Sequence, residues 1–517
     1  MKYLSKLLKA FFLLTLFLLF LLTRYYHSFF LRSGGGYGSG DGFGVITDAY
    51  LVKGFNLNTY FTAYFYSLVH HLIPVSWLTI SYIVSPFFSL GIILGIFLLI
   101  KKEFGFLQAF FTSLWLILNP YLAYQSTEPS KEIFVLFFFI YSFYFLHLFI
   151  KNNEKIYLII PAVIFGIGSF FYHSIYIYLP FLIFLLLIKN GSYAKIYFKK
   201  FFKTNLINIV IFLIIVLIIS SPFYIAKEII GSSELKQKPA ILLTQKDTYG
   251  GIFISQFNAM IGALENPKYL GFDGLNQGIE NYIDGKNQIL ILFGIVFVIS
   301  FIEFSRRRRT TMGLEFSLLT VYSYMVVGSQ WSASSQSSRY PQYMMYFLLT
   351  VSSLIFIYVF RLLSPKKNLL IIFVVLFLLF TFFASNPLKI VDISRNWYAG
   401  HTKIGYLLKN LGIQIDNNHK IMYLGWPSLS LSLLENYKLK TMDNLITFGW
   451  DSVNLTGLSS KKYIENNNIK YYIYTHSLQD YSKSSDIVLQ NLKKNFLLRQ
   501  IDLNNGNYIP VYKILEK

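Results

Sequence analysis

The sequence contains no cysteine in 517 residues, and only 14% of its residues are charged. The absence of cysteine excludes disulfides, thiolate metal sites and cysteine nucleophiles, so any exported part must be stable through packing alone. The low charged fraction stands beside 54% hydrophobic and 19% aromatic residues, which excludes an ordinary soluble globular composition. We therefore predict a polytopic membrane protein.

Acidic residues are scarce relative to basic ones, with 25 Asp and Glu against 46 Lys and Arg and a net charge of +21. Such an excess can indicate nucleic-acid binding, but here the basic residues occur mostly in short clusters between apolar runs. That distribution is what orientation in a lipid bilayer requires. We predict contact with membrane lipids and no nucleic-acid partner.

A spanning helix needs about 20 mostly apolar residues, and the sequence offers about eleven such runs. The first run is followed by Thr23, Arg24, Tyr25 and Tyr26 rather than by a small-residue cleavage site, so we expect it to be retained. The eleven predicted spans are 7–23, 77–100, 105–123, 132–150, 156–171, 175–188, 205–226, 288–304, 312–328, 341–360 and 368–385.

Lys and Arg in the connecting loops predict the orientation. With a cytoplasmic N-terminus, nineteen of them lie in the inside loops, whereas Lys131 and Arg339 alone lie in the three short outside loops. The predicted localisation is the plasma membrane, with the loops 24–76 and 227–287 and the C-terminal domain outside. The loop 227–287 fits either a mobile lid or an amphipathic connector on the membrane surface.

Two domains are predicted, a transmembrane domain over 1–385 and an extracytoplasmic α/β domain over 386–517. In the second, 419–425 and 469–476 are expected to be buried strands, while 459–467 and 485–495 are expected to be helices. The segments 497–503 and 508–515 are expected to form a hairpin closed by Asn504-Asn505-Gly506-Asn507.

The polar, glycine-dense stretch 33–54 carries Asp41 and Asp48 in the first outer loop. A carboxylate held at the membrane surface is a candidate general base, and a flexible linker is the alternative reading. Asp41 stands between two glycines, where backbone can approach a ligand closely. Asp48 begins the segment DAYLVKG, where its side chain is expected to cap a short helix. We therefore expect Asp41 to be the base and Asp48 to be structural.

Further candidates lie in the later outer loops. Glu128 and Lys131 flank Pro129 and are either part of a site or the start of a helix. Arg339, followed by Tyr340, stands at the outer mouth of a predicted span, where a snorkelling arginine and an arginine that binds an anionic partner are both consistent with the sequence.

The spacing of Asp41, Ala49 and Gly54, in an outer loop that ends in an aromatic interfacial helix, resembles the GT-C superfamily of polyprenyl-phosphate-sugar glycosyltransferases. Protein O-mannosyltransferases and lipid A aminoarabinose transferases are members. The resemblance implies that Asp41 is the catalytic carboxylate, although Gly42 stands where the family usually has a second acid, which leaves Asp48 as a rival. It also implies that Arg339-Tyr340 meets the lipid-linked phosphate.

The implied activity is inverting transfer of a hexosyl or pentosyl group from a polyprenyl-phosphate donor to a lipid, glycan or protein acceptor. A divalent cation is compatible with the acidic candidates, but nothing in the sequence requires one. Two alternatives remain: a polymerase or ligase of lipid-linked polysaccharide repeat units, and a lipid-linked sugar transporter or flippase. A transporter usually carries ionisable residues within its spans, and the apolar runs here are nearly free of charge.

Overall fold

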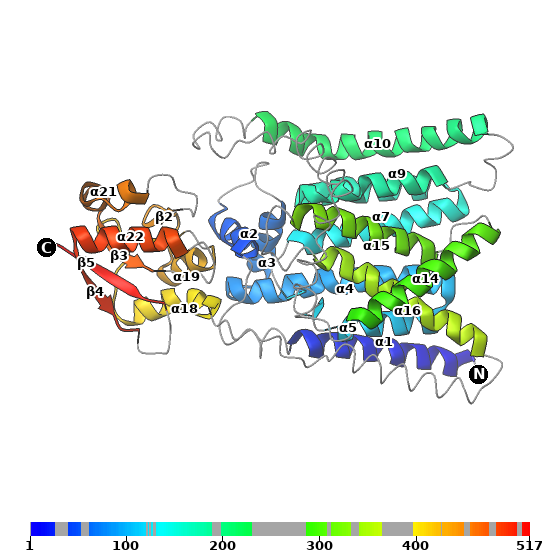
Figure 1. The fold of residues 1–517 in the computed structure, drawn as a ribbon, viewed down its shortest axis with the longest axis horizontal. Helices are drawn as coiled ribbons and strands as arrows, with labels where there is room; N and C mark the ends of the chain where they lie inside the picture. The colour runs from blue at the N-terminus through cyan, green and yellow to red at the C-terminus, as the bar shows by residue number, and fades with distance from the viewer. Residues whose placement is uncertain are drawn as a thin grey trace. The chain divides into compact units, whose positions relative to one another are not determined.

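Long helices make up one part of the chain, and a mixed β-sheet with its helices makes up another (Figure 1). The computed structural model describes residues 2–25, 40–52, 61–119, 122–123, 126–127, 131–188, 198–229, 286–307, 312–331, 341–363, 397–424, 427–448, 455–474, 482–503 and 509–517. Unit 1 comprises Met1–His27, Phe55–Tyr64 and Tyr82–Val391, and unit 2 comprises Ser28–Gly54, Phe65–Ser81 and Asp392–Lys517. Two stretches from the predicted first outer loop therefore belong to the unit that contains the sheet.

Unit 1 is built from apolar helices. They are α1 (Lys2–Tyr25), most of α4 (Trp77–Phe104), α5 (Phe106–Leu118), α7 (Lys131–Asn152), α8 (Ile156–Phe171), the 3₁₀ helix η2 (His173–Tyr178), α9 (Leu179–Ile188), α10 (Phe198–Ile229), α14 (Lys286–Arg307), α15 (Met312–Trp331) and α16 (Pro341–Leu363). The predicted spans from 7–23 to 341–360 coincide with these helices, whereas 368–385 lies outside the described residues. The count of eleven spans stays a prediction.

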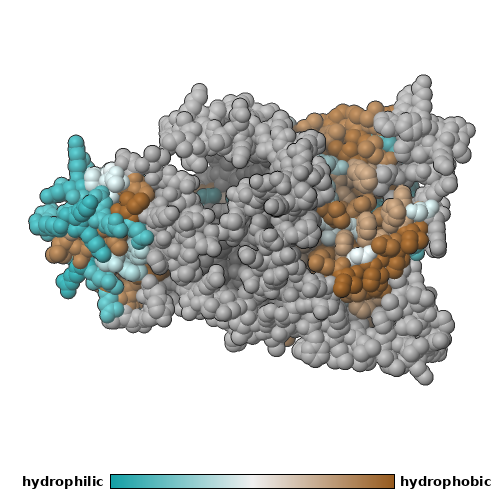
Figure 2. Space-filling view, in the orientation of Figure 1, coloured by the Kyte–Doolittle hydropathy of each residue, from teal (hydrophilic) through white to brown (hydrophobic). Residues whose placement is uncertain are grey.

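Length and surface both identify unit 1 as a multi-pass membrane protein. Among the described residues, four helical stretches are long and apolar enough to cross a bilayer: Lys6–Tyr25, Ile83–Phe104, Lys131–Asn152 and Asn205–Pro222. Large apolar side chains such as Phe11, Leu217 and Ile291 are exposed on α1, α10 and α14. Figure 2 shows hydrophobic residues in the region of α10 and α14 and mainly hydrophilic residues over the described part of unit 2. Exposed apolar side chains on long helices are stable against lipid and costly in water.

Inside unit 1 the helices are joined by close backbone approach and by buried hydroxyls. A Cβ atom on Gly91 of α4 would clash with the ring of Phe137 on α7, which is how small residues permit tight packing between membrane helices. The Ser89 Oγ and Tyr346 OH atoms lie 2.9 Å apart and connect α4 to α16. Thr112 and Ser353, 2.8 Å apart, connect α5 to α16 in the same way.

Unit 2 contains a five-stranded sheet in the order β2-β1-β3-β5-β4. Its strands are β1 (Lys420–Leu424), β2 (Leu445–Phe448), β3 (Ile469–Ile473), β4 (Leu497–Ile501) and β5 (Val511–Leu515). The pairs β1–β2 and β1–β3 are parallel, while β3–β5 and β4–β5 are antiparallel. The helices are α18 (Trp397–Asn410), α19 (Pro427–Tyr437), α20 (Leu455–Leu458), α21 (Lys461–Asn466) and α22 (Ser482–Asn495).

The predicted strands at 419–425 and 469–476 are β1 and β3, and the predicted helices are α21 and α22. The expected hairpin is the antiparallel pair β4–β5, and its closing turn 504–508 lies outside the described residues. The elements α18, α19 and β2 were not predicted. The assignment of 386–517 to a separate extracytoplasmic domain stays a prediction, because unit 2 also includes Ser28–Gly54 and Phe65–Ser81.

Candidate functional site

The stretch that carries Asp41 and Asp48 is largely helical, which corrects the expectation of a glycine loop. Helix α2 covers Gly40–Leu51, so Asp41 lies in its first turn and the flanking glycines are helical. Asp48 is exposed and lies eight residues after the helix begins. The prediction that Asp48 is an N-cap is therefore wrong, since an N-cap residue precedes the first helical residue.

Helix α2 lies against α19 of the same unit, which was not foreseen from the sequence. Val45, Ile46 and Ala49 are buried. The Tyr50 hydroxyl donates to the Leu434 carbonyl oxygen at 3.1 Å, and Tyr50 also packs against the core of the sheet. Unit 2 therefore holds helix α2, which carries Asp41 in its first turn.

The start of α4 contacts α19 as well, through Glu435. The Ser76 Oγ atom accepts from the Thr79 backbone N–H at 3.2 Å, which is the geometry of a serine N-cap. The Glu435 Oε1 atom lies 3.4 Å from the Trp77 backbone nitrogen. Burial raises the pKa of the Glu435 carboxyl, and the hydrogen bond from the Trp77 N–H partly opposes that rise. The partial positive charge at the N-terminus of α4 likewise offsets part of the cost of burying this carboxylate.

His70, part of the adjacent pair predicted to lie at the membrane interface, stacks on the Trp77 ring with centroids 4.1 Å apart. His71 is exposed. Within the part of the chain that the structure describes, no group of three or more His, Cys, Asp or Glu side chains is arranged to hold a metal ion. Packing against Trp77 therefore accounts for His70 alone.

Among the candidates in the later outer loops, the structure describes Lys131. This residue begins α7, and its Nζ atom lies 5.5 Å from the centroid of the Tyr172 ring. The next residue, Glu132, is buried at 1% exposure. Glu128, Arg339 and Tyr340 lie outside the described residues, as does the side chain of Asp41, so their places in the site stay predictions.

Arg24 is a buried cation that is not among the site residues predicted from the sequence. It belongs to the last turn of α1, and its side chain is 2% exposed. Its Nη1 atom donates to the Ile117 carbonyl oxygen at 2.7 Å and to Thr23 Oγ1 at 3.0 Å. An arginine directly after an apolar run usually snorkels to the interface, and burial in the folded chain is what distinguishes Arg24 from that case.

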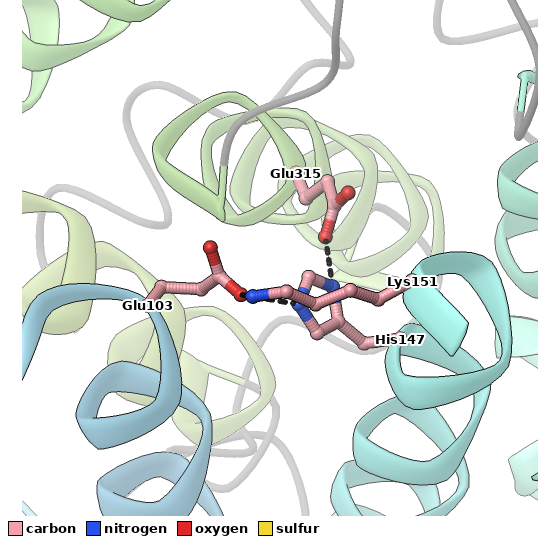
Figure 3. Close-up of polar contacts among 4 residues, drawn as sticks. All are labelled: Glu103, His147, Lys151 and Glu315. Atoms are coloured by element: carbon pink, nitrogen blue, oxygen red, sulfur yellow. Dashed lines mark hydrogen bonds and ion pairs between the residues drawn. The ribbon is translucent and has the colours of Figure 1, made fainter.

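A second group of polar side chains connects α4, α7 and α15 in unit 1 (Figure 3). His147 on α7 lies between Glu315 on α15 and Glu103 at the end of α4, with ring nitrogens 3.2 Å and 3.1 Å from the two carboxylates. Lys151 donates to the same Glu103 oxygen at 2.7 Å. The two carboxylates lie on opposite ring nitrogens, so they cannot share one metal ion with the imidazole.

This group corrects the statement that the spans are nearly free of charge. His147 and Glu315 fall within the predicted spans 132–150 and 312–328 and are almost completely buried. Glu315 is the single ionisable Asp, Glu, Lys, Arg or His in 312–328, and His147 shares 132–150 with Glu132 alone, so each is isolated in a long apolar run. Their pairing depends on contacts between helices far apart in the sequence.

Residues 58–224 match the sequence profile of the dolichyl-phosphate-mannose-protein mannosyltransferase family. The matched segment runs from just before α3 (Phe61–Leu72) into α10 and contains α4, α5, α7, α8 and α9. No curated protein gives a significant match to the chain.

Two solved structures show distant similarity. One is an oligosaccharyltransferase from Archaeoglobus fulgidus, solved in complex with Zn and sulfate, with 11% identity and a TM-score of 0.49 over 88% of this chain and 67% of that chain. The other is ArnT from Cupriavidus metallidurans bound to undecaprenyl phosphate, with 10% identity and a TM-score of 0.46 over 98% and 97%. The family match over residues 58–224 confirms the predicted similarity of this chain to the GT-C glycosyltransferases.

Proposed function

We propose that this protein is a membrane glycosyltransferase that moves a sugar from a polyprenyl-phosphate donor to an acceptor on the outer face of the membrane. The match of residues 58–224 to the mannosyltransferase family is the observation that carries the proposal. The long apolar helices of unit 1 agree with an enzyme whose donor is embedded in the bilayer. The hexosyl or pentosyl identity of the sugar and the nature of the acceptor are finer parts of the same proposal.

In the proposed reaction the donor supplies its own leaving group. The acceptor oxygen attacks the anomeric carbon, the bond from that carbon to the phosphate oxygen breaks, and the acceptor proton passes to the carboxylate of Asp41. A single displacement of this kind inverts the anomeric configuration. The departing polyprenyl phosphate gains negative charge, so a bidentate guanidinium at Arg339 is suited to stabilise it.

The support for Asp41 is its position on a helix that unit 2 holds in place. Helix α2 is anchored through Tyr50 and Leu434, and Asp41 lies in its first turn. Asp48 lies later on the same helix and is exposed, with no N-cap role to explain it, so it remains the rival base. Comparison of the two acids is therefore the decisive experiment.

Purified protein would be incubated with polyprenyl-phosphate sugars, and donor consumption would be measured for wild type, Asp41→Asn and Asp48→Asn. Since a general base typically contributes about 10²–10⁴-fold, Asp41→Asn should lose most turnover. Asp48→Asn serves as the matched control on the same helix and should retain turnover within a few-fold. If Asp48→Asn were inactive and Asp41→Asn close to wild type, the assignment would be reversed.

A lipid-linked sugar transporter is the alternative that the structure brings closer. His147 and Glu315 are buried ionisable residues within predicted spans, a feature usual in transporters. The same assay separates the two, because a transporter leaves the bond between sugar and phosphate intact. Absence of donor cleavage with every polyprenyl-phosphate sugar and acceptor supplied would overturn the proposed enzyme.

A further inference from the structure

Arg24 is buried with the Nε and Nη2 atoms, which carry three of its five guanidinium N–H groups, unpaired. The Nη1 atom is satisfied by Ile117 and Thr23, and the Cζ atom lies 4.6 Å from the centroid of the Phe20 ring, which covers one face of the guanidinium. The Nε and Nη2 atoms are buried and have no hydrogen-bond partner. Among the described residues no carboxylate forms an ion pair with this side chain.

The satisfied half of Arg24 has a structural explanation. Ile117 is in the last turn of α5, and Arg24 itself is in the last turn of α1, so the cation lies at the negative ends of two helix dipoles. Such a contact stabilises a helix end by about 0.3–1 kcal/mol at exposed positions. It does not account for the two unpaired nitrogen atoms, because burying polar groups without partners costs more free energy than the contact contributes.

The identity of the unpaired atoms indicates the missing partner. Nε and Nη2 form one edge of the guanidinium, and their two N–H groups are parallel and spaced to meet two oxygens of one phosphate or carboxylate. Tyr346, on the second turn of α16, is close enough to Arg24 to interact with it electrostatically, and its hydroxyl is hydrogen-bonded to Ser89. Helix α16 directly follows Arg339 and Tyr340 in the sequence.

We propose that Arg24 binds the phosphate group of the lipid-linked sugar donor through its Nε and Nη2 edge, in addition to the role proposed for Arg339. The proposal rests on the proposed function and assigns a binding role to a residue that the family resemblance does not single out. Exclusion of water around the guanidinium strengthens its attraction for an anion. Arg24, at the end of α1, is thus a residue that binds the lipid-linked sugar donor.

The test separates phosphate binding from helix capping. Apparent melting temperature would be measured while the protein is titrated with polyprenyl phosphate, which carries the anion but no sugar. Polyprenol, which has the same tail without phosphate, and inorganic phosphate, which has no tail, serve as matched ligands. A ligand that binds only the folded protein raises its stability in proportion to RT ln(1 + [L]/Kd).

For wild type we expect stabilisation by polyprenyl phosphate and none by polyprenol or inorganic phosphate at the same concentrations. Arg24→Gln should shift the midpoint of the polyprenyl-phosphate titration to about 10- to 100-fold higher concentration, the effect of losing charge-assisted hydrogen bonds. Arg24→Lys keeps the charge but loses the two parallel N–H groups, so its titration midpoint should lie between those of wild type and Arg24→Gln. Lys9→Gln, near the other end of α1 and also beside an aromatic ring, should titrate as wild type.

A capping role predicts a different result. Arg24→Gln would then melt at lower temperature without ligand but titrate with the wild-type midpoint, and that outcome overturns the proposal. If Arg24→Gln does not fold, Arg24→Lys takes its place, and a wild-type titration midpoint for Arg24→Lys also overturns the proposal. Equal stabilisation by inorganic phosphate would assign the site to free phosphate instead. A wild-type protein that neither titrates with polyprenyl phosphate nor consumes any donor would remove the proposed function and this site together.

Discussion

The Nδ1 atom of His147 lies 3.2 Å from the Oε2 atom of Glu315, a contact between α7 and α15 that joins residues 168 positions apart. The other ring nitrogen meets Glu103 at 3.1 Å, which makes His147 a bridge between α4 and α15. An ionised carboxylate only accepts hydrogen bonds, so with both acids ionised the ring must donate from both nitrogens as an imidazolium. Lys151 and His147 then balance the two carboxylates.

His147→Gln should destabilise the protein strongly. Glutamine has one amide group and cannot donate to Glu103 and Glu315 on opposite sides, so the buried Glu315 carboxylate loses its partner. Breaking a buried pair in this way lowers the free energy of unfolding by about 3–5 kcal/mol. Lys151→Gln is the matched control: its side chain is 46% exposed, and an exposed pair contributes about 0–1 kcal/mol. Apparent melting temperatures of the purified variants measure the difference. Equal effects of the two substitutions would contradict a bridging role for His147.

Gly405→Ala should destabilise unit 2. The added Cβ would clash with the Ser432 backbone, and the Gly405 N–H already donates to Ser432 Oγ at 3.0 Å, so α18 and α19 cannot separate without losing that bond. Overpacking of this kind costs about 1–3 kcal/mol. Gly294→Ala is the control, since a Cβ there meets nothing within 4 Å and alanine favours the helix by roughly 0.5–1 kcal/mol. A higher melting temperature for both variants would show that α18 and α19 are not tightly packed.

Glu435→Gln should change the pH dependence of stability. Burial raises the pKa of the Glu435 carboxyl, so the ionised form is disfavoured in the folded state at neutral pH. This unfavourable contribution is present above the raised pKa and disappears as pH falls below the unfolded value of about 4.3. Glutamine removes it while its carbonyl oxygen can still accept from the Trp77 N–H.

The melting temperature of Glu435→Gln relative to wild type should therefore be highest near pH 7 and the gap should close by about pH 4. Glu465→Gln provides the control, because Glu465 is 44% exposed and forms an i,i+4 pair with Lys461 at 3.8 Å. A gap that widens on acidification would mean that the Glu435 carboxylate is stabilised rather than disfavoured by its surroundings.

The orientation predicted from the Lys and Arg distribution can be tested with single cysteines, because the chain has none. Lys493→Cys, exposed at the end of α22, should react with an impermeant thiol reagent in intact cells. Lys102→Cys, exposed at the end of α4 in a predicted inside loop, should react only after lysis. The reverse labelling pattern would place unit 2 in the cytoplasm.

Features that depend on local sequence were predicted well. A run of about 20 apolar residues has no stable alternative to a helix in lipid, so the spans from 7–23 to 341–360 followed from composition. Alternating and continuous apolar residues indicated β1, β3 and the hairpin β4–β5 for a similar reason, since neighbouring residues determine strand and turn preferences. Asp41, Arg339 and Tyr340 were selected from short motifs, and their roles stay predictions because the family match over 58–224 does not include them.

The supporting contacts were decided by tertiary structure. Asp48 was interpreted as a helix start because cap preference is local, whereas α2 begins at Gly40 and buries Val45, Ile46 and Ala49. The environment of Arg24 depends on α5, and that of His147 on α4 and α15. A sequence determines which side chains are available and which segments are helices or strands. Which buried charges meet depends on contacts between segments tens to hundreds of residues apart, whose energies appear only when the helices pack together.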